Sequence, residues 1–221
     1  MKKVLLAGNS ITADILYSYL KDDHRYEVIG TTVDDEYINF NCIDGIKSFG
    51  MSQLTRLFSP NDLTIIMAMG YDNLNRERES MFYRLKELGY TIETYIHPDA
   101  RVYSKKQLGE GCVILSNAVI EPHVLVGENS IIWCNATLAH HCKVAEHCWI
   151  ASGAVISGQA NILRNSFVGV NATIVNEITV GELNIIGAAA MISKDTKPNT
   201  VHLSRSAEEF RYSSDNYVKF F

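Results

Sequence analysis

The sequence has little of what defines several large protein classes. Its 221 residues include only 4 prolines and 14 glycines, which excludes collagen-like and proline-rich low-complexity chains. No apolar run approaches the roughly 20 residues that a membrane-spanning helix needs. No cluster of lysine and arginine stands out in a chain of net charge −5, which argues against binding to a nucleic-acid backbone. The 5 cysteines are odd in number and unevenly spread, so we expect no disulfide framework.

Apolar side chains, in contrast, are plentiful. Hydrophobic residues make up 47% of the chain and charged residues 20%, enough for a sizeable folded core in one large domain or two small ones. The N-terminus starts like a signal peptide, with two lysines before an apolar stretch. Polar residues follow Ala7, however, and no small-residue cleavage site comes after them. We therefore interpret this segment as a first strand and expect the protein to be cytoplasmic.

Residues 1–96 alternate between strand-like and helix-like stretches. Short apolar runs predict strands over residues 3–7, 26–33, 62–69 and 90–96. Apolar residues at helical spacing predict helices over residues 11–20 and 73–88, with Gly89 as the stop of the second. This alternation is typical of a small parallel sheet with helices on its faces.

The second half follows a period of six. From Val102 to Ile192 every sixth residue is Val, Leu or Ile, sixteen in succession without an insertion. The residue four positions after each is mostly small, as at Cys112 and Ala118. This hexapeptide repeat predicts a parallel β-helix in which three units make one 18-residue coil of a triangular prism. We expect domains over residues 1–96 and 97–200, and an aromatic-rich tail over 201–221 that packs on the β-helix or on a neighbouring subunit.

The sequence combines an α/β domain, an Ile-His-Pro-x-Ala junction from Ile96 to Ala100, and an uninterrupted hexapeptide β-helix. In these features the chain resembles the bacterial sugar acyltransferases over nearly its whole length. That family includes N-acetyltransferases of nucleotide-linked 4-amino-sugars and sialic-acid O-acetyltransferases. The resemblance implies a Rossmann-like domain that binds the nucleotide of the sugar and a left-handed β-helix. It also implies a homotrimer that binds acetyl-CoA in a groove between subunits.

The resemblance assigns the general base to His140. The family places its base in a His-Asp/Glu-Cys-x-Ile-Gly context, which here is His-His-Cys-Lys-Val-Ala. His141 thus stands in place of an acidic residue and Ala145 in place of a glycine. Trp133 and Trp149 occupy positions where family members often carry an Asn and a second His. Acetyl transfer to an amine needs a base, and imidazole, with an ordinary pKa near 6.5, suits that task.

The 18-residue coil predicts which residues accompany the base. Gly158 lies one coil beyond His140, so its backbone N–H is expected to meet the thioester carbonyl as the oxyanion forms. Asn176 and Lys194 continue the same corner, where the pantetheine arm of acetyl-CoA would run, with Lys194 at a CoA phosphate. The Gly187-Ala188 stretch allows the close backbone approach that an adenine or a pantetheine amide needs. Small residues at β-helix corners are also explained by packing alone.

A cluster near the base has the composition of a zinc site. It consists of His140, His141, Cys142, His147 and Cys148. Cys142 and Cys148 occupy the small, inward position of the repeat, so we expect structural cysteines and no metal. His141 shares a column with His123, one coil earlier, and either orients His140 or is simply exposed.

Several residues of the first half are candidates for substrate binding. The turn Gly8-Asn9-Ser10 follows the first strand and opens a helix, where backbone N–H groups would meet an anion or a nucleotide. It lacks G-x-G-x-x-G, which disfavours a dinucleotide cofactor. Asp34 and Asp35 end the second strand. Gly70, Asn73 and Arg76 resemble the Gly-Asn-x-x-x-Arg stretch of the family. Ordinary loop chemistry explains these residues equally well.

The leading hypothesis is an acetyl-CoA-dependent N-acetyltransferase. It would act on the amino group of a nucleotide-linked amino-dideoxy sugar, in the synthesis of a surface polysaccharide or another glycan. The alternatives are O-acetylation of a sialic acid or other sugar hydroxyl, and a non-catalytic β-helix subunit. The homotrimer is also expected because Trp133, Trp149 and Phe167 fall at outward positions, and large exposed apolar side chains mark interfaces.

Overall fold

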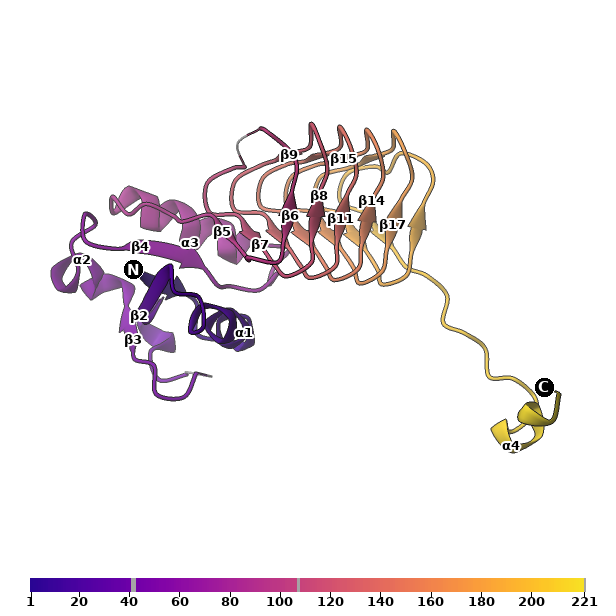
Figure 1. Cartoon of the computed structure of the whole chain (residues 1–221), viewed down its shortest axis with the longest axis horizontal. Coiled ribbons are helices and arrows are strands. Elements are labelled where there is room, and N and C mark those ends of the chain that lie inside the picture. Colours follow the sequence, from indigo (N-terminus) through magenta and orange to yellow (C-terminus); the bar gives the residue numbers. More distant parts are fainter. Residues whose placement is uncertain (41–42, 107, 221) are drawn as a thin grey trace.

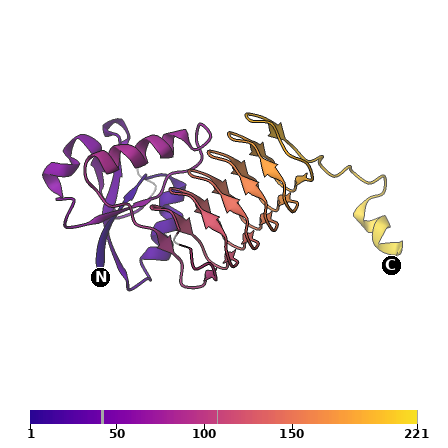
Figure 2. The same ribbon diagram turned by 90° about the horizontal axis from the view of Figure 1, so that it is seen from above.

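The computed structural model describes residues 1–40, 43–106 and 108–220. An α/β domain and a triangular β-helix lie next to each other along the long axis of the molecule, and the C-terminal tail extends from the far end (Figures 1 and 2). Within the described ranges no helix is long and apolar enough to cross a membrane.

The α/β domain is built on a four-stranded parallel sheet, sheet A, of order β3-β2-β1-β4. Its strands are β1 (Lys2–Ala7), β2 (Tyr26–Val33), β3 (Ser48–Gly50) and β4 (Thr64–Met67). Its helices are α1 (Ile11–Leu20), α2 (Leu54–Leu57) and α3 (Arg76–Glu87), with short 3-10 turns η1 (Asp35–Tyr37) and η2 (Met51–Gln53). Side chains of β1 point alternately to two buried clusters, Val4 and Leu6 to one and Leu5 and Ala7 to the other, as expected of a strand covered on both faces.

The strands and helices predicted for this domain are confirmed, with three differences. β3 and α2 were not predicted, because their three and four residues are too few to give a pattern. Helix α3 begins at Arg76 and not at 73, since Asn73 to Asn75 adopt positive φ values of 49–64°. The predicted strand over 90–96 is divided. Ile92 makes an isolated bridge to Ile65 of sheet A, whereas the last two residues pair with the β-helix.

The β-helix has three faces, each a parallel sheet of two-residue strands. Sheet B contains β5 (Tyr95–Ile96), β7 (Val113–Ile114), β10 (Ile131–Ile132), β13 (Trp149–Ile150), β16 (Phe167–Val168), β19 (Ile185–Ile186) and β21 (Val201–His202). Sheet C contains β6 (Arg101–Val102), β8 (Val119–Ile120), β11 (Thr137–Leu138), β14 (Val155–Ile156), β17 (Thr173–Ile174) and β20 (Met191–Ile192). Sheet D contains β9 (Leu125–Val126), β12 (Lys143–Val144), β15 (Asn161–Ile162) and β18 (Thr179–Val180).

The repeat in the sequence accounts for this architecture. Ile131 pairs with Val113 on one side and Trp149 on the other, so one coil takes 18 residues as predicted. The branched residue of each unit is buried in a single core that runs the length of the prism. From Gly111 to Ala189 each corner contains a residue of positive φ, often Asn or His, the types that tolerate this conformation best after Gly. The small residue that follows is buried against the corner, as at Ala118.

The two domains share a buried interface formed by sheet B and the edge between sheets D and B. Trp149 and Phe167 point out of the β-helix but pack on the ring of Tyr71, at 5.1 and 4.6 Å between centroids. Trp149 is only 5% exposed, and Trp133 and Phe167 are partly buried in the same cluster. The expectation that these three residues mark a subunit interface is therefore wrong, because the chain's own α/β domain covers them.

Arg78 of α3 fastens this interface. Its fully buried guanidinium donates hydrogen bonds to the carbonyl of Gly70 at 2.8 Å and, across the interface, to the carbonyl of His147 at 3.0 Å. Burial lowers its pKa to about 10, so the group remains charged at neutral pH. The cation also lies over the ring of Trp149, at 5.7 Å.

The C-terminal tail leaves the β-helix after β21. Its short helix α4 (Ser214–Tyr217) and the 3-10 turn η3 (Val218–Phe220) stand away from the body of the molecule (Figure 1). The aromatic side chains of the tail contact one another, as Phe210 and Tyr217 do at 5.3 Å between centroids. Among the described residues the tail does not pack along its own β-helix beyond Ser204. The expected packing of residues 201–221 on their own β-helix is therefore confirmed for β21 and Ser204 and wrong for the residues after them, whereas packing on a neighbouring subunit stays a prediction.

Candidate active site

His140 lies at the edge between sheets C and D, in the turn from β11 to β12. Its side chain is exposed, and its backbone N–H donates to Oε2 of Glu121 at 2.7 Å. Its imidazole covers Gly158. A Cβ atom at that glycine would lie 2.6 Å from Cε1 and 2.9 Å from Nε2 of the ring. The structure thus brings together the residue pair that the coil arithmetic predicted, and a side chain at residue 158 would displace the ring.

Two further histidines adjoin His140. Nδ1 of His141 lies 3.3 Å from Nδ1 of His140. The ring of His141 also stacks on that of His123, with centroids 4.6 Å apart and an interplanar angle of 30°. Both residues adopt positive φ, so the repeat itself places the two rings one above the other.

The predicted cofactor residues lie on two different edges of the prism. Asn176 and Lys194 are exposed and follow Gly158 at successive turns of the C–D edge. Gly187 and Ala188 instead follow β19, at the edge between sheets B and C. There the N–H of Gly187 donates to the carbonyl of His202 at 2.7 Å. Gly158, Asn176 and Lys194 thus share the edge on which the 18-residue count placed them, whereas Gly187 and Ala188 lie on another edge.

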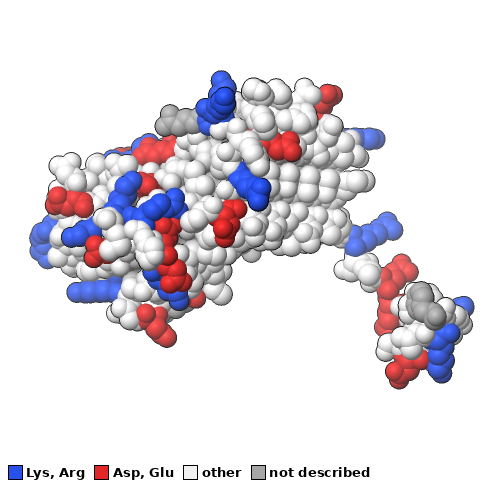
Figure 3. Space-filling view, in the orientation of Figure 1, with Lys and Arg blue, Asp and Glu red and all other residues white. Residues whose placement is uncertain are grey.

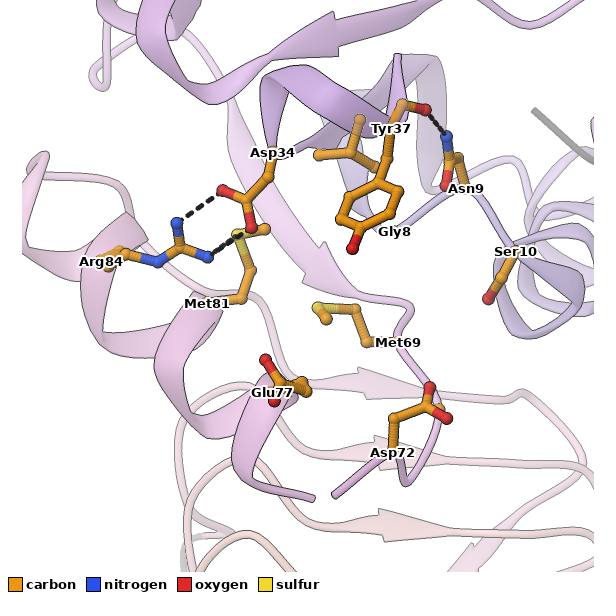
Figure 4. A pocket seen from close by; sticks show the side chains of 12 residues that line it. Gly8, Asn9, Ser10, Asp34, Tyr37, Met69, Asp72, Glu77, Met81 and Arg84 are labelled. Carbon is orange, nitrogen blue, oxygen red and sulfur yellow. Dashed lines mark hydrogen bonds and ion pairs between the residues drawn. The ribbon is translucent and has the colours of Figure 1, made fainter. Parts of the chain in front are cut away.

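The α/β domain contains a cavity of about 350 Å³ at the carboxyl ends of β1, β2 and β4. Figure 4 shows the side chains that surround it. They belong to Gly8, Asn9, Ser10, Val33, Asp34, Tyr37, Met69, Gly70, Asp72, Glu77, Met81 and Arg84. Ligands of open α/β sheets bind at this edge.

Short contacts shape the walls of this cavity. Gly8 has a φ of 120°, and a Cβ atom there would lie 2.7 Å from the carbonyl oxygen of Ala68, so a side chain does not fit. The amide of Asn9 donates to the carbonyl of Tyr37 at 2.8 Å. Asp34 accepts two hydrogen bonds from Arg84, at 2.6 and 3.0 Å. This contact raises the pKa of the Arg84 guanidinium above its ordinary value.

Two predicted substrate residues do not line the cavity. Asp35 accepts a hydrogen bond from the backbone N–H of Ser52 at 3.3 Å, on the side of β3. Asn73 donates from Nδ2 to Oε1 of Glu77 at 3.1 Å. The lining residues that sequence reasoning missed include three from α3: Glu77, Met81 and Arg84. Their spacing of four and three residues places them on one helix face, a signal that the predicted helix already carried.

Three cysteines of the repeat lie in the core of the β-helix. Cys112, Cys142 and Cys148 are buried, and burial raises the pKa of each thiol to about 12. They therefore remain protonated in the core. In the part of the chain that the structure describes, no group of three or more His, Cys, Asp or Glu side chains is placed to hold a metal ion.

Comparisons with known proteins agree with this architecture. The bacterial transferase hexapeptide family (six repeats) matches residues 105–140 and 123–158. No curated protein matches the chain. Among solved structures, the acetyltransferase domain of PglB from Neisseria gonorrhoeae, solved with acetyl coenzyme A, is 25% identical with a TM-score of 0.78. The match covers 90% of this chain and 95% of that one.

Two further solved structures show the same fold at lower identity. PerB from Caulobacter crescentus, solved with CoA and GDP-perosamine, is 21% identical with a TM-score of 0.80, over 91% of this chain and 93% of that one. WeeI from Acinetobacter baumannii is 15% identical with a TM-score of 0.79, over 91% and 96%. The predicted fold class, an α/β domain followed by a left-handed β-helix, is thereby confirmed. The chain therefore contains the repeats of the bacterial transferase hexapeptide family and has the two-domain fold of the PglB acetyltransferase domain and of PerB, as the resemblance in its sequence predicted.

Proposed function

We propose that this chain transfers the acetyl group of acetyl-CoA to the amino group of a nucleotide-linked amino-dideoxy sugar. The observation that carries this proposal is the imidazole of His140, exposed at a β-helix edge and held over Gly158. The solved structures of the PglB domain with acetyl coenzyme A and of PerB with CoA and GDP-perosamine support the choice of substrates.

His140 acts as the general base in the proposed reaction. The sugar nitrogen attacks the thioester carbon and loses a proton to Nε2 of the ring as the C–N bond forms. The C–S bond then breaks, and CoA leaves as a thiolate that takes up a proton. Gly158 lies against the ring, so its N–H is close to the atoms that react there and can stabilise the oxyanion of the tetrahedral intermediate.

The cavity of the α/β domain is the proposed nucleotide site. The Gly8-Asn9-Ser10 turn opens α1, and the N-terminus of a helix attracts phosphate through its free N–H groups and its dipole. Asp34, at the end of β2, presents a carboxylate that accepts hydrogen bonds from ribose hydroxyls or from the N–H edge of a base.

The two proposed sites lie on different sides of one chain. The α/β domain covers sheet B and the D–B edge, where Arg78 and Trp149 meet. His140 occupies the C–D edge. We therefore propose that a second copy of the chain brings its His140 to the cavity, within a homotrimer. A groove between two copies would be lined by the C–D edge of one chain, which carries Lys194, and by the B–C edge of the next chain, which carries Gly187.

The surface of the β-helix supports this assembly. Sheet C lies between the C–D and B–C edges, and its outward residues after the first strand are Val119, Thr137, Val155, Thr173 and Met191. Figure 3 shows that this face is largely free of charge, whereas the α/β domain carries many charges of both signs. An extended uncharged face is expected of a surface that another copy or a ligand covers.

A complementation experiment tests the shared site. His140→Ala removes the base, and Ser10→Glu places a negative charge where the phosphates would bind. Each variant alone should be inactive in a CoA-release assay with acetyl-CoA and GDP-perosamine or a UDP-linked 4-amino sugar. When the two variants are co-expressed, a shared site is intact only where one copy supplies His140 and the other supplies Ser10. Random assembly of a closed oligomer makes about a quarter of the sites intact, so about a quarter of wild-type activity should return. Absence of activity in the mixed oligomer would contradict the shared site.

The same assay separates the alternatives. An O-acetyltransferase would release CoA with hydroxyl acceptors such as a sialic acid and not with amino sugars. A non-catalytic subunit would release none with any acceptor, although a thermal-shift titration would still detect its ligands.

A further inference from the structure

The histidine contact at the C–D edge has a chemical direction. Nδ1 of His140 and Nδ1 of His141 are 3.3 Å apart, so in a hydrogen bond between them one nitrogen carries the proton and the other accepts it. If Nδ1 of His140 accepted, a neutral ring would carry its proton on Nε2 and would have no free lone pair there. If Nδ1–H of His140 donates, Nε2 is free to take a proton from the substrate.

We propose that His141 is a positioning residue that holds His140 in the Nδ1–H tautomer by accepting its hydrogen bond. The inference rests on the proposed function of His140 as the base. His141 needs a fixed ring to accept in one direction, and the stacked ring of His123 provides that support at 4.6 Å. A neutral imidazole thus performs at residue 141 the orienting task for which a carboxylate is the commoner choice.

The other described residues around the two rings make no hydrogen bond with Nδ1 of His140 and so do not orient its ring. The carboxylate of Glu121 accepts the backbone N–H of His140 at 2.7 Å, so it supports the turn and not the ring. His123 stacks on the ring of His141. The next residue of that column is the neutral Gln159, whose amide donates to Glu177. Of these neighbours, only His141 contacts Nδ1 of His140.

The backbone of residue 141 allows an informative set of substitutions. Its φ is 63°, a conformation that Gly, Asn and Asp adopt readily. Oδ1 of Asn or Asp is bonded to Cγ, as Nδ1 of His is, so both can accept from the same position. His141→Gly removes the acceptor, His141→Asn keeps a neutral acceptor, and His141→Asp supplies a charged one. None of the three strains the turn.

The tautomer itself is measurable by nitrogen-15 NMR of the imidazole rings in the purified chain, with no acetyl acceptor present. The resonance of His140, assigned from His140→Ala, should show Nδ1–H in the wild type and in His141→Asn. It should shift toward the Nε2–H form in His141→Gly. A wild-type His140 in the Nε2–H form, or a His141→Gly spectrum identical to the wild type, would overturn the proposal whether or not the chain is active.

Kinetics with acetyl-CoA and GDP-perosamine provide the second arm. His141→Gly should lower kcat by about 10- to 10²-fold, the usual effect of losing a partner that orients a histidine, with KM for both substrates unchanged. His141→Asn should stay within about threefold of the wild type. In His141→Asp the acidic limb of the kcat/KM profile should move to higher pH, because a carboxylate stabilises the imidazolium.

The exposed His24, far from the edge in a loop after α1, supplies the control, and His24→Ala should be unchanged. Equal losses in His141→Gly and His141→Asn would overturn the orienting role. A wild type that acetylates neither GDP-perosamine nor a UDP-linked amino sugar would overturn the proposed function, while the NMR result would still decide the tautomer.

Discussion

Gly158→Ala tests whether the position of the His140 ring matters to catalysis. The added methyl group would lie 2.6 Å from Cε1, 2.9 Å from Nε2 and 3.2 Å from Nδ1 of the ring. Carbon atoms in contact prefer about 3.5–4.0 Å, so the ring must move by about 1 Å. A displacement of that size at a reacting group lowers turnover by roughly 10²-fold. We therefore expect kcat to fall by about that factor.

Stability should barely change in this variant. His140 is exposed and its ring can swing toward solvent, so the free energy of unfolding should fall by less than about 1 kcal/mol. The melting temperature and the kcat of CoA release are the two measurements. In a His140→Ala background the same methyl group should have no further effect on kcat, because the ring that it displaces is already gone. A Gly158→Ala enzyme with near-normal kcat, or a full additional loss in the double variant, would refute the reasoning.

Three further outcomes are expected. Lys194→Ala should raise KM for acetyl-CoA and leave kcat nearly intact if this exposed lysine meets a CoA phosphate, and an unchanged KM would remove it from the site. Arg78→Met should lower the free energy of unfolding by about 3–5 kcal/mol in chemical denaturation, because several buried carbonyls lose their donor. A loss below about 1 kcal/mol would contradict the role of Arg78 in holding the two domains together. Burial holds the pKa of His147 below its ordinary value. The unfolded chain therefore binds the proton more readily than the folded chain. The free energy of unfolding should keep its full value above about pH 6.5 and decrease below that pH by at most about 1.4 kcal/mol per pH unit. His147→Gln should make this decrease smaller.

The β-helix could be predicted from Val102 to Ile192 because its constraints are local, whereas its strands β5 and β21 lie outside the repeat. Each unit needs a branched residue inside and a small one at the corner, and the chain supplies both at fixed intervals from Val102 onward. The pairing of His140 with Gly158 followed from the same count. The separation of Gly187 from that edge also follows from it, because 187 and 140 do not differ by a multiple of 18 residues.

Contacts between distant segments could not be predicted in this way. The pattern shows that Trp149 and Phe167 point out of the prism, but not that the α/β domain covers that face. The α/β sheet has no repeat, so the cavity depended on general rules for strand ends. Those rules led to Gly8 and Asp34, which line the cavity, and also to Asp35, which begins the 3-10 turn η1 and contacts Ser52 instead.

The assignment of His140 as the general base is tested most directly by the kcat of His140→Ala beside that of His141→Ala. A positioned base typically contributes roughly 10²–10⁴-fold, so His140→Ala should lose about that much kcat while KM for acetyl-CoA persists. His141→Ala should lose less, because it leaves the base in place. A His140→Ala enzyme with near-normal kcat, or a His141→Ala enzyme that is the more severely impaired of the two, would contradict the assignment.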